Sequence, residues 1–225
     1  RGLGDVYKRQ HIIAANEGAA IGLGIGYHLS SGKTPLIYLQ NSGHGNTVNP
    51  LLSLASSEVY SIPILLLIGW RGEPGVKDEP QHIHQGRVTP NLLDAMDIPY
   101  IIIDSQMSQD EVLNSIIDQL DICKKEKKPV CVLVRKGTFE TYKKKSNESP
   151  HNNLKLEREE AVEIAAKECE KDAVIVCTTG MLSRELFEYR AINSLGHGKD
   201  FLCVGGMGHA SQIATGISIN QNLTI

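Results

Sequence analysis

The stretch LIYLQNSGHGNTVNPLLSLASSEVYSIPILLLIG, residues 36–69, decides the fold class. It begins with a short apolar run at 36–39 and ends with a continuous apolar run at 62–68, and both runs have the length of strands. Between them Pro50 opens a helical segment, because proline fits the first turn of a helix. A continuous apolar strand is typical of a parallel sheet that is buried on both faces. The stretch therefore predicts a strand–helix–strand unit.

The same alternation continues along the chain and predicts an α/β protein with two doubly wound parallel sheets. Further strands are expected at 100–103, 130–134, 173–177 and 201–204. Helices are expected at 16–31, 49–56, 91–96, 108–123, 157–170, 182–192 and from 209 onward. Ser108 and Glu111 form a capping box, a long charged loop is expected at 70–87, and the Gly- and Ala-rich helix at 16–31 is expected to be buried.

Composition shifts divide the chain into domains. Residues 1–10 do not resemble the start of a domain and are interpreted as a non-native leader. Residues 146–153 are polar and are interpreted as a linker, and the preceding lysines as part of a solvated segment rather than a nucleic-acid patch. This leaves a first domain at 11–145, incomplete at its N-terminus, and a truncated second domain at 154–225.

Charge and cysteine content exclude several classes of protein. The formal net charge of −3 gives no general attraction to nucleic acid or to anionic membranes, so neither partner is expected. The longest apolar run is too short to span a bilayer, and no signal peptide is visible. The five cysteines are odd in number and lack metal-ligand spacing, which predicts reduced, mostly buried thiols in a cytoplasmic protein.

Several polar or Gly-rich segments are candidates for chemistry. Glu17 is a lone carboxylate at the head of an apolar helix, where the helix dipole alone would also favour it. The polar cluster at 40–46 and the charged loop follow strands, where ligands of open α/β sheets bind. His82 and His84 have no third ligand at a suitable spacing, so a metal site is disfavoured. Two further turns, at 178–180 and 205–210, connect strands to helices; the second is Gly-rich and suited to phosphate binding.

These segments together resemble a known family. NEGAAIGLGIGYHLSSGK (16–33), the stretch from 39 to 82, TTGMLSRELFEYR (178–190) and GGMGHASQIATG (205–216) resemble the phosphonopyruvate decarboxylases, which use thiamine diphosphate. The resemblance implies a pyrimidine-binding domain at 11–145 and the first part of a diphosphate-binding domain from 154 onward. It also implies thiamine diphosphate and Mg²⁺ as cofactors, in a homo-oligomer whose cofactor lies between two subunits.

The resemblance also implies roles for single residues. Glu17 matches the catalytic glutamate that hydrogen-bonds N1′ of the aminopyrimidine. Gly205 would offer its carbonyl to the 4′-amino group, and Met207 would wedge between the two rings of the cofactor unless it packs in the core. The implied cofactor-binding set is Asn41, Ser42, Gly43, Thr178, Thr179, Gly180, Gly205 and Met207. The substrate candidates are Arg71, the first choice for a phosphonate, and Lys77, His82 and Arg87.

Two departures from the family pattern stand out. His44 occupies a position that is usually apolar, and the chain ends before the family's metal-binding motif, so no metal ligand is assigned. The polypeptide by itself is therefore expected to be inactive. The implied reaction converts the 2-oxo acid 3-phosphonopyruvate to phosphonoacetaldehyde and CO₂, in phosphonate biosynthesis. Two alternatives stay open: decarboxylation of sulfopyruvate, and a non-catalytic α/β module that binds nucleotides or another protein.

Overall fold

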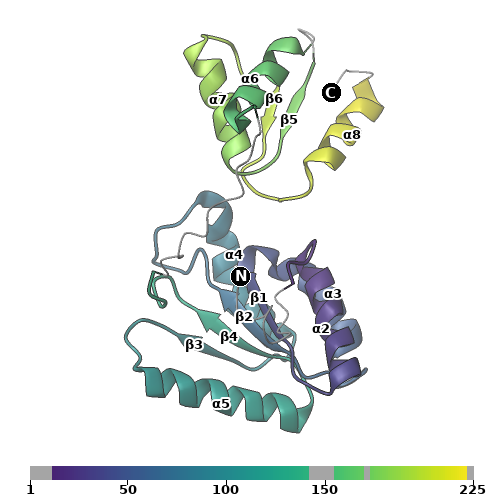
Figure 1. Cartoon of the computed structure of the whole chain (residues 1–225), viewed down its shortest axis with the longest axis vertical. Coiled ribbons are helices and arrows are strands. Elements are labelled where there is room, and N and C mark those ends of the chain that lie inside the picture. Colours follow the sequence, from purple (N-terminus) through teal and green to yellow (C-terminus); the bar gives the residue numbers. More distant parts are fainter. Residues whose placement is uncertain (1–11, 142–154, 170–172, 222–225) are drawn as a thin grey trace. The chain divides into compact units, whose positions relative to one another are not determined.

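The computed structural model describes residues 12–141, 155–169 and 173–221. The chain divides into two compact units, residues 1–142 and residues 143–225. The proposed leader at 1–10 and the proposed linker at 146–153 lie outside the described residues. Both units consist of parallel strands connected by helices, which confirms the predicted α/β class (Figure 1).

The first unit is built on a four-stranded parallel sheet in the order β1-β2-β4-β3. Its strands are β1 (Leu36–Gln40), β2 (Leu65–Gly69), β3 (Tyr100–Ile103) and β4 (Val130–Val134). Its main helices are α2 (Glu17–Ser31), α4 (Pro80–Ala95) and α5 (Gln109–Glu126). Three short helical segments connect β1 to β2: η1 (Asn41–Thr47), α3 (Val48–Pro50) and η2 (Leu51–Ala55).

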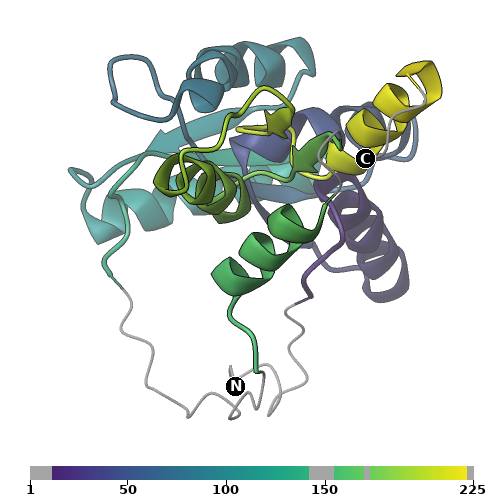
Figure 2. The ribbon, with the colours of Figure 1, turned by 90° about the horizontal axis from the view of Figure 1, so that it is seen from above.

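Apolar side chains pack on both faces of this sheet, because neighbouring residues of a strand point to opposite faces. On one face Ile21 of α2 and Leu93 of α4 belong to the core around Leu133 of β4. On the other face Ile116 of α5 packs with Val132, the preceding residue of β4. Helices on both faces, visible in Figures 1 and 2, confirm that the first unit is doubly wound.

The prediction of a charged loop at 70–87 followed by a short helix at 91–96 is wrong. A single helix, α4, begins at Pro80 and includes Pro90. Proline has no N–H, so Pro90 cannot bond the carbonyl four residues earlier, which belongs to Gly86. The indole N–H of Trp70 donates to that carbonyl instead, at 2.8 Å. The hydrogen bond from Trp70, which lies outside the helix, thus compensates for the one that Pro90 cannot make.

Other boundaries also differ from the predictions, among them the two around the connection from β1 to β2. The helical connection after β1 starts at Asn41 rather than near residue 49, because the polar cluster itself coils into η1. The second strand begins at Leu65 rather than at Ile62, although Ile62 and Ile64 are buried. Pro63 lacks the N–H that a ladder needs, which accounts for the later start of β2.

Helix α2 is less buried than its composition predicts. Ile21 and Gly24 face the core, but Leu23 and Tyr27 are 50% and 43% exposed. A Cβ added to Gly22 would meet no atom within 4 Å. One face of α2 is therefore apolar and open in the single chain.

The second unit contains a smaller parallel sheet of β5 (Ile175–Cys177) and β6 (Asp200–Leu202). Its helices are α6 (Arg158–Glu168), α7 (Met181–Ile192) and α8 (Ala210–Gln221). Leu186 of α7 is fully buried, and Arg190 of the same helix is paired with Asp200 at the start of β6 at 3.0 Å. Strand and helix alternate here as the sequence predicts.

Membrane and redox features follow from the described residues. Among them no helix combines the length and apolar character needed to cross a membrane.

All five cysteines are free: Cys123, Cys131 and Cys203 are buried, Cys177 is half-buried and Cys169 is exposed. Burial raises the pKa of the Cys123 thiol to about 11, so this group stays protonated near neutral pH.

Candidate active site

Glu17 is the first residue of α2. The preceding Asn16 caps the helix, and its Oδ1 accepts a hydrogen bond from the backbone N–H of Ala19 at 2.9 Å. A carboxylate in the first turn is stabilised by the helix dipole, as the sequence allowed. The side chain is half-buried and contacts η1, which follows β1 in the sequence.

The short helical segment η1 contacts the carboxylate of Glu17 on two sides. Asn46 Nδ2 donates to Glu17 Oε2 at 2.9 Å, although the residues are 29 positions apart. A Cβ on Gly43 would overlap the carboxyl group of Glu17. Likewise, a Cβ on Gly18 would lie only 2.8 Å from the carbonyl oxygen of Asn46. Glycines thus allow the start of α2 and the loop η1 to meet closely around one carboxylate.

The side chain of Asn41 connects the segments after β1 and β2 by hydrogen bonds. The register that pairs Gln40 with Gly69 places the two loops side by side. Asn41 Nδ2 donates to the Arg71 carbonyl at 2.8 Å, and Asn41 Oδ1 accepts from the Arg71 N–H at 2.9 Å. A third bond runs from Nδ2 to Thr89 Oγ1 of α4 at 3.0 Å. Asn41 is only 3% exposed, so its amide serves the fold, and its neighbour Ser42 donates to Gln40 Oε1 at 2.7 Å.

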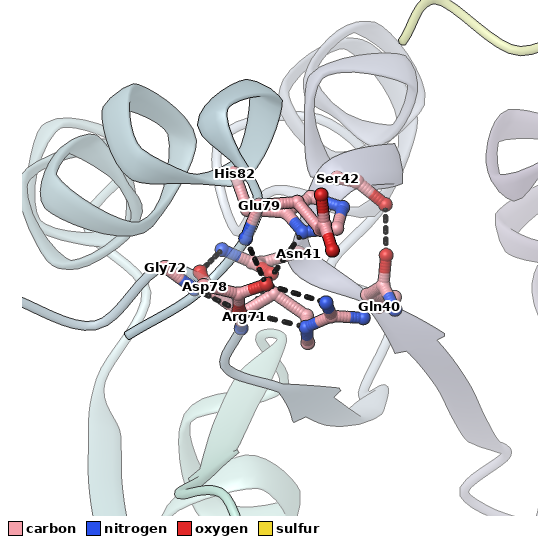
Figure 3. A network of polar contacts seen from close by, with 8 residues as sticks. All are labelled: Gln40, Asn41, Ser42, Arg71, Gly72, Asp78, Glu79 and His82. Carbon is pink, nitrogen blue, oxygen red and sulfur yellow. Dashed lines mark hydrogen bonds and ion pairs between the residues drawn. The ribbon is translucent and has the colours of Figure 1, made fainter. Parts of the chain in front are cut away.

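Asp78 organises the loop after β2, as Figure 3 shows. Its carboxylate accepts from Arg71 Nε at 2.8 Å and also from Arg71 Nη2. It further accepts from the backbone N–H groups of Gly72 and Glu79, each at 2.8 Å, and from His82 Nδ1 at 2.9 Å. Chiefly the Arg71 hydrogen bonds hold the pKa of Asp78 well below its usual range, against the opposing effect of burial.

The structure gives the four substrate candidates different surroundings. Arg71 and His82 are both bound to Asp78, and the Arg71 side chain is 37% exposed. Lys77 and Arg87 line one pocket of about 510 Å³, together with Gly72, Asp78 and Ile83. Arg87 Nη2 also donates to His84 Nδ1 at 2.9 Å. Within the described ranges no three His, Cys, Asp or Glu side chains are grouped to share a metal ion.

His44 is buried in the middle of η1. The residue is 1% exposed, and neither ring nitrogen has a hydrogen-bond partner in the part of the chain that the structure describes. Burial lowers the pKa of His44 to about 4, so the ring is neutral near pH 7. The polar residue thus fills a core position of the kind that the family pattern gives to an apolar one.

In the second unit the two Gly-containing turns share one edge of the sheet. Residues 178–180 follow β5, 205–207 follow β6, and Cys203 N–H donates to the Cys177 carbonyl at 3.2 Å between them. Gly180, Gly206 and Gly208 all have positive φ, at 91°, 66° and 90°. Met207 is 77% exposed, so the alternative that it packs in the core is wrong.

Sequence reasoning missed two residues of the first unit that the structure places centrally. In the sequence Asn46 is one residue of a polar cluster, and a hydrogen bond to Glu17, 29 positions away, leaves no local signal. Asp78 follows Lys77 in a charged loop. The one sequence feature that points to its pairing with Arg71 is their opposite charge. Each forms contacts that depend on how the loop folds.

Comparisons with known proteins agree with this architecture. The family model described as "Thiamine pyrophosphate enzyme, N-terminal TPP binding domain" matches residues 3–98. A phosphonopyruvate decarboxylase of Streptomyces viridochromogenes is 30% identical, with 94% of this chain and 54% of that protein covered. A sulfopyruvate decarboxylase subunit alpha of Methanococcus maripaludis is 38% identical, with 56% of this chain and 71% of the subunit covered.

A second sulfopyruvate decarboxylase, of Methanosarcina acetivorans, is 24% identical, with 91% of this chain and 54% of that protein covered. The chain spans about half the length of the phosphonopyruvate decarboxylases it matches. The resemblance seen in the sequence is thereby confirmed at the level of the family. The chain belongs to the thiamine-diphosphate-dependent decarboxylases of the phosphonopyruvate and sulfopyruvate type.

Proposed function

We propose that the enzyme containing this chain decarboxylates 3-phosphonopyruvate to phosphonoacetaldehyde and CO₂, with thiamine diphosphate as cofactor. The observation that carries the proposal is the half-buried Glu17, held by Asn46 against Gly43. A carboxylate so placed at a helix start can hold a proton opposite N1′ of an aminopyrimidine. The first unit is then the pyrimidine-binding domain, and the second begins the diphosphate-binding domain.

The residues present fit the cofactor. Glu17 Oε2 is bonded to Asn46, while Oε1 accepts no hydrogen bond from any described residue, so one oxygen is available to a ring nitrogen. When bound, thiamine diphosphate supplies an electron sink for the bonding pair that CO₂ leaves behind. Glu17 contributes by holding and returning a proton at Oε1. Gly43 contributes by leaving room for the carboxyl group, and Asn41 and Ser42 keep the surrounding loop in place.

The second unit would hold the rest of the cofactor. Thr178, Thr179, Gly180 and Gly205 follow the carboxyl ends of parallel strands, where ligands of open α/β sheets bind. The positive φ of Gly180 permits a turn whose backbone N–H groups can face phosphate oxygens. The exposed Met207 side chain is free to contact the two rings. Mg²⁺ belongs to this proposal as the partner of the diphosphate, with no ligand assigned in this chain.

The anionic end of the substrate would bind the loop after β2. Lys77 and Arg87 share one pocket and become the first candidates, since the guanidinium of Arg71 is already bonded to Asp78. His82 is fixed through Nδ1, which leaves Nε2 to contact a substrate oxygen. Arg71 would then support the pocket and add positive charge from its exposed side.

Sulfopyruvate is the second candidate substrate. The Methanococcus subunit alpha is 38% identical over 125 residues, a higher identity than the 30% over 224 residues of the Streptomyces enzyme. Phosphonate can carry two negative charges and sulfonate only one, so two cations in one pocket favour the phosphonate. The two proposed functions differ only in whether phosphonopyruvate or sulfopyruvate binds in this pocket.

Self-association belongs to the same proposal. The open face of α2, with Leu23 and Tyr27 exposed and Gly22 free of neighbours, is suited to contact with a second copy. In that arrangement the cofactor would lie between domains of two subunits. The expected state in solution is therefore a homo-oligomer.

The test is a substrate comparison in the full-length enzyme with Glu17→Gln as the matched variant. Wild-type enzyme should release CO₂ from phosphonopyruvate with a higher kcat/KM than from sulfopyruvate or pyruvate. Glu17→Gln keeps the size of the side chain but cannot accept the proton, so kcat should fall by about 10²-fold or more with the fold intact. Undiminished decarboxylation by Glu17→Gln would reject the proposal, and turnover of none of the three acids would favour a non-catalytic module.

A further inference from the structure

We propose that Asn46 is a positioning residue for Glu17, whose side-chain amide holds Oε2 so that Oε1 faces the aminopyrimidine. This inference rests on the proposed function of Glu17. It assigns to Asn46 an effect on the rate of the proton transfer and not on substrate binding.

The geometry places Asn46 where it can act on one oxygen only. Its Nδ2 lies 2.9 Å from Glu17 Oε2, the distance of a well-formed N–H···O bond. The other oxygen, Oε1, lies against the backbone of Gly43, where a Cβ would overlap it. The amide and the glycine together fix a long side chain that would otherwise populate several rotamers.

Asn46 is itself anchored close to the start of α2. Its carbonyl oxygen would be only 2.8 Å from a Cβ on Gly18, so the glycine after Glu17 permits this approach. The contact brings residues of η1 and α2 together at the point where the carboxylate is needed. Each of the three neighbours, Asn46, Gly43 and Gly18, therefore supports the same orientation.

An amide suits this task because it donates without titrating. Its N–H stabilises the charged form of the carboxylate at Oε2 and does not compete for the proton at Oε1. An aspartate at position 46 would have the same size but would place a second carboxylate beside the first. Asn46→Asp therefore tests the chemistry of the side chain separately from its size.

The first measurement uses the 225-residue chain without cofactor. A restrained Glu17 side chain should show two separate NMR resonances for its γ protons, because the two protons have different surroundings. In Asn46→Ala and Asn46→Asp the side chain is released, and the two resonances should merge. The control is Asn49→Ala, an exposed asparagine of the neighbouring α3 whose Oδ1 accepts from Ser53 Oγ and whose side chain makes no hydrogen bond to Glu17.

The second measurement uses the full-length enzyme loaded with thiamine diphosphate. Asn46→Ala should lower kcat by about 10- to 100-fold, the usual effect of one hydrogen bond to a charged group, with KM changed less than about twofold. Proton–deuterium exchange at C2 of the cofactor should slow by a similar factor. If Asn46→Ala does not fold, the isosteric Asn46→Asp decides the outcome in its place.

The possible outcomes separate this inference from the proposed function. Full activity of Glu17→Gln removes the proposed function, and the inference with it. An inactive Glu17→Gln beside an Asn46→Ala enzyme of wild-type kcat overturns the inference alone. Lost activity with unchanged Glu17 resonances also overturns it, since Asn46 would then act by another route.

Discussion

The carboxamide of Asn41 is bonded to both backbone polar groups of Arg71, donating to its carbonyl and accepting from its N–H. The side chain thereby behaves like a short piece of strand that continues the pairing of β1 with β2 past the end of the sheet. Its third bond, to Thr89, adds α4 to the same junction. Segment η1, the loop after β2 and helix α4 therefore meet at one buried amide.

Asn41→Ala should destabilise the first unit strongly. The change removes three hydrogen bonds and leaves the Arg71 N–H and carbonyl without their partner at a partly buried position. We expect a loss of about 2–4 kcal/mol in the free energy of unfolding, measured by urea denaturation. Asn49→Ala, at an exposed position of α3, should change the free energy of unfolding by less than about 0.5 kcal/mol. Unchanged stability with weakened cofactor binding would instead support the cofactor-binding role that the family resemblance implies for Asn41.

Gly43→Ala should reduce activity far more than Gly45→Ala. A Cβ at position 43 meets the carboxyl group of Glu17, whereas a Cβ at position 45 meets nothing within 4 Å. The added methyl group must push Glu17 away from Asn46, so C2 exchange and kcat should fall by about tenfold or more. Equal activity of the two variants, measured in the full-length enzyme, would show that the Glu17 carboxyl moves without consequence.

His44 should make the stability of the first unit pH-dependent. Its pKa is about 4 in the folded chain and 6.5 ordinarily, so the unfolded chain takes up a proton at a higher pH than the folded one. The part of the free energy of unfolding that depends on a neutral His44 is fully present above pH 6.5. About 3 kcal/mol of it is lost as the pH falls from 6.5 to 4.

The variant that isolates this effect is His44→Leu. It should flatten the pH dependence of the free energy of unfolding between pH 7 and 4.5, and it should stabilise the chain by removing two unpaired nitrogens. His84→Leu, on the exposed surface of α4, should keep the wild-type profile. A His44→Leu protein that loses stability with pH as steeply as wild type would show that the pKa of His44 is not lowered by folding.

Arg71→Ala should lower the melting temperature of the chain, whereas Lys77→Ala should change substrate binding. Arg71→Ala breaks the pair with Asp78 and should lower Tm, and Asp78→Ala should lower it by a similar amount without additivity between the two. Lys77→Ala should leave Tm unchanged and raise KM for phosphonopyruvate by about tenfold relative to pyruvate. A selective KM effect in Arg71→Ala at unchanged Tm would instead restore Arg71 as the first substrate contact.

Local signals in the sequence were sufficient for much of the fold. The strand at 130–134 follows from its apolar residues, and the start of α5 follows from Ser108 and Glu111, which exchange hydrogen bonds at 2.7 and 3.2 Å. Helix α4 was missed because Pro90 is acceptable there only with help from Trp70, a contact between segments. Composition likewise predicts an apolar α2 but not which face stays open.

For the candidate active site the sequence identified residue types better than residue relationships. Glu17 stood out as a lone charge, yet its partner Asn46 is 29 positions away and looks like any polar loop residue. The charge and planar shape of Arg71 predict a substrate contact, but the nearby Asp78 binds the same guanidinium. Such pairings depend on the path of the backbone, which short patterns do not encode.

The sheet order β1-β2-β4-β3 constrains how the first unit assembles during synthesis. β4 is the last strand of the first unit to leave the ribosome, yet it lies between β2 and β3. Strand β3 therefore has no neighbour in the sheet until residues 130–134 have emerged. β1 and β2 can pair earlier, since both are present once residue 69 has appeared. A nascent chain stalled before residue 130 would therefore expose the unpaired edges of β2 and β3, a state prone to aggregate or to bind a chaperone.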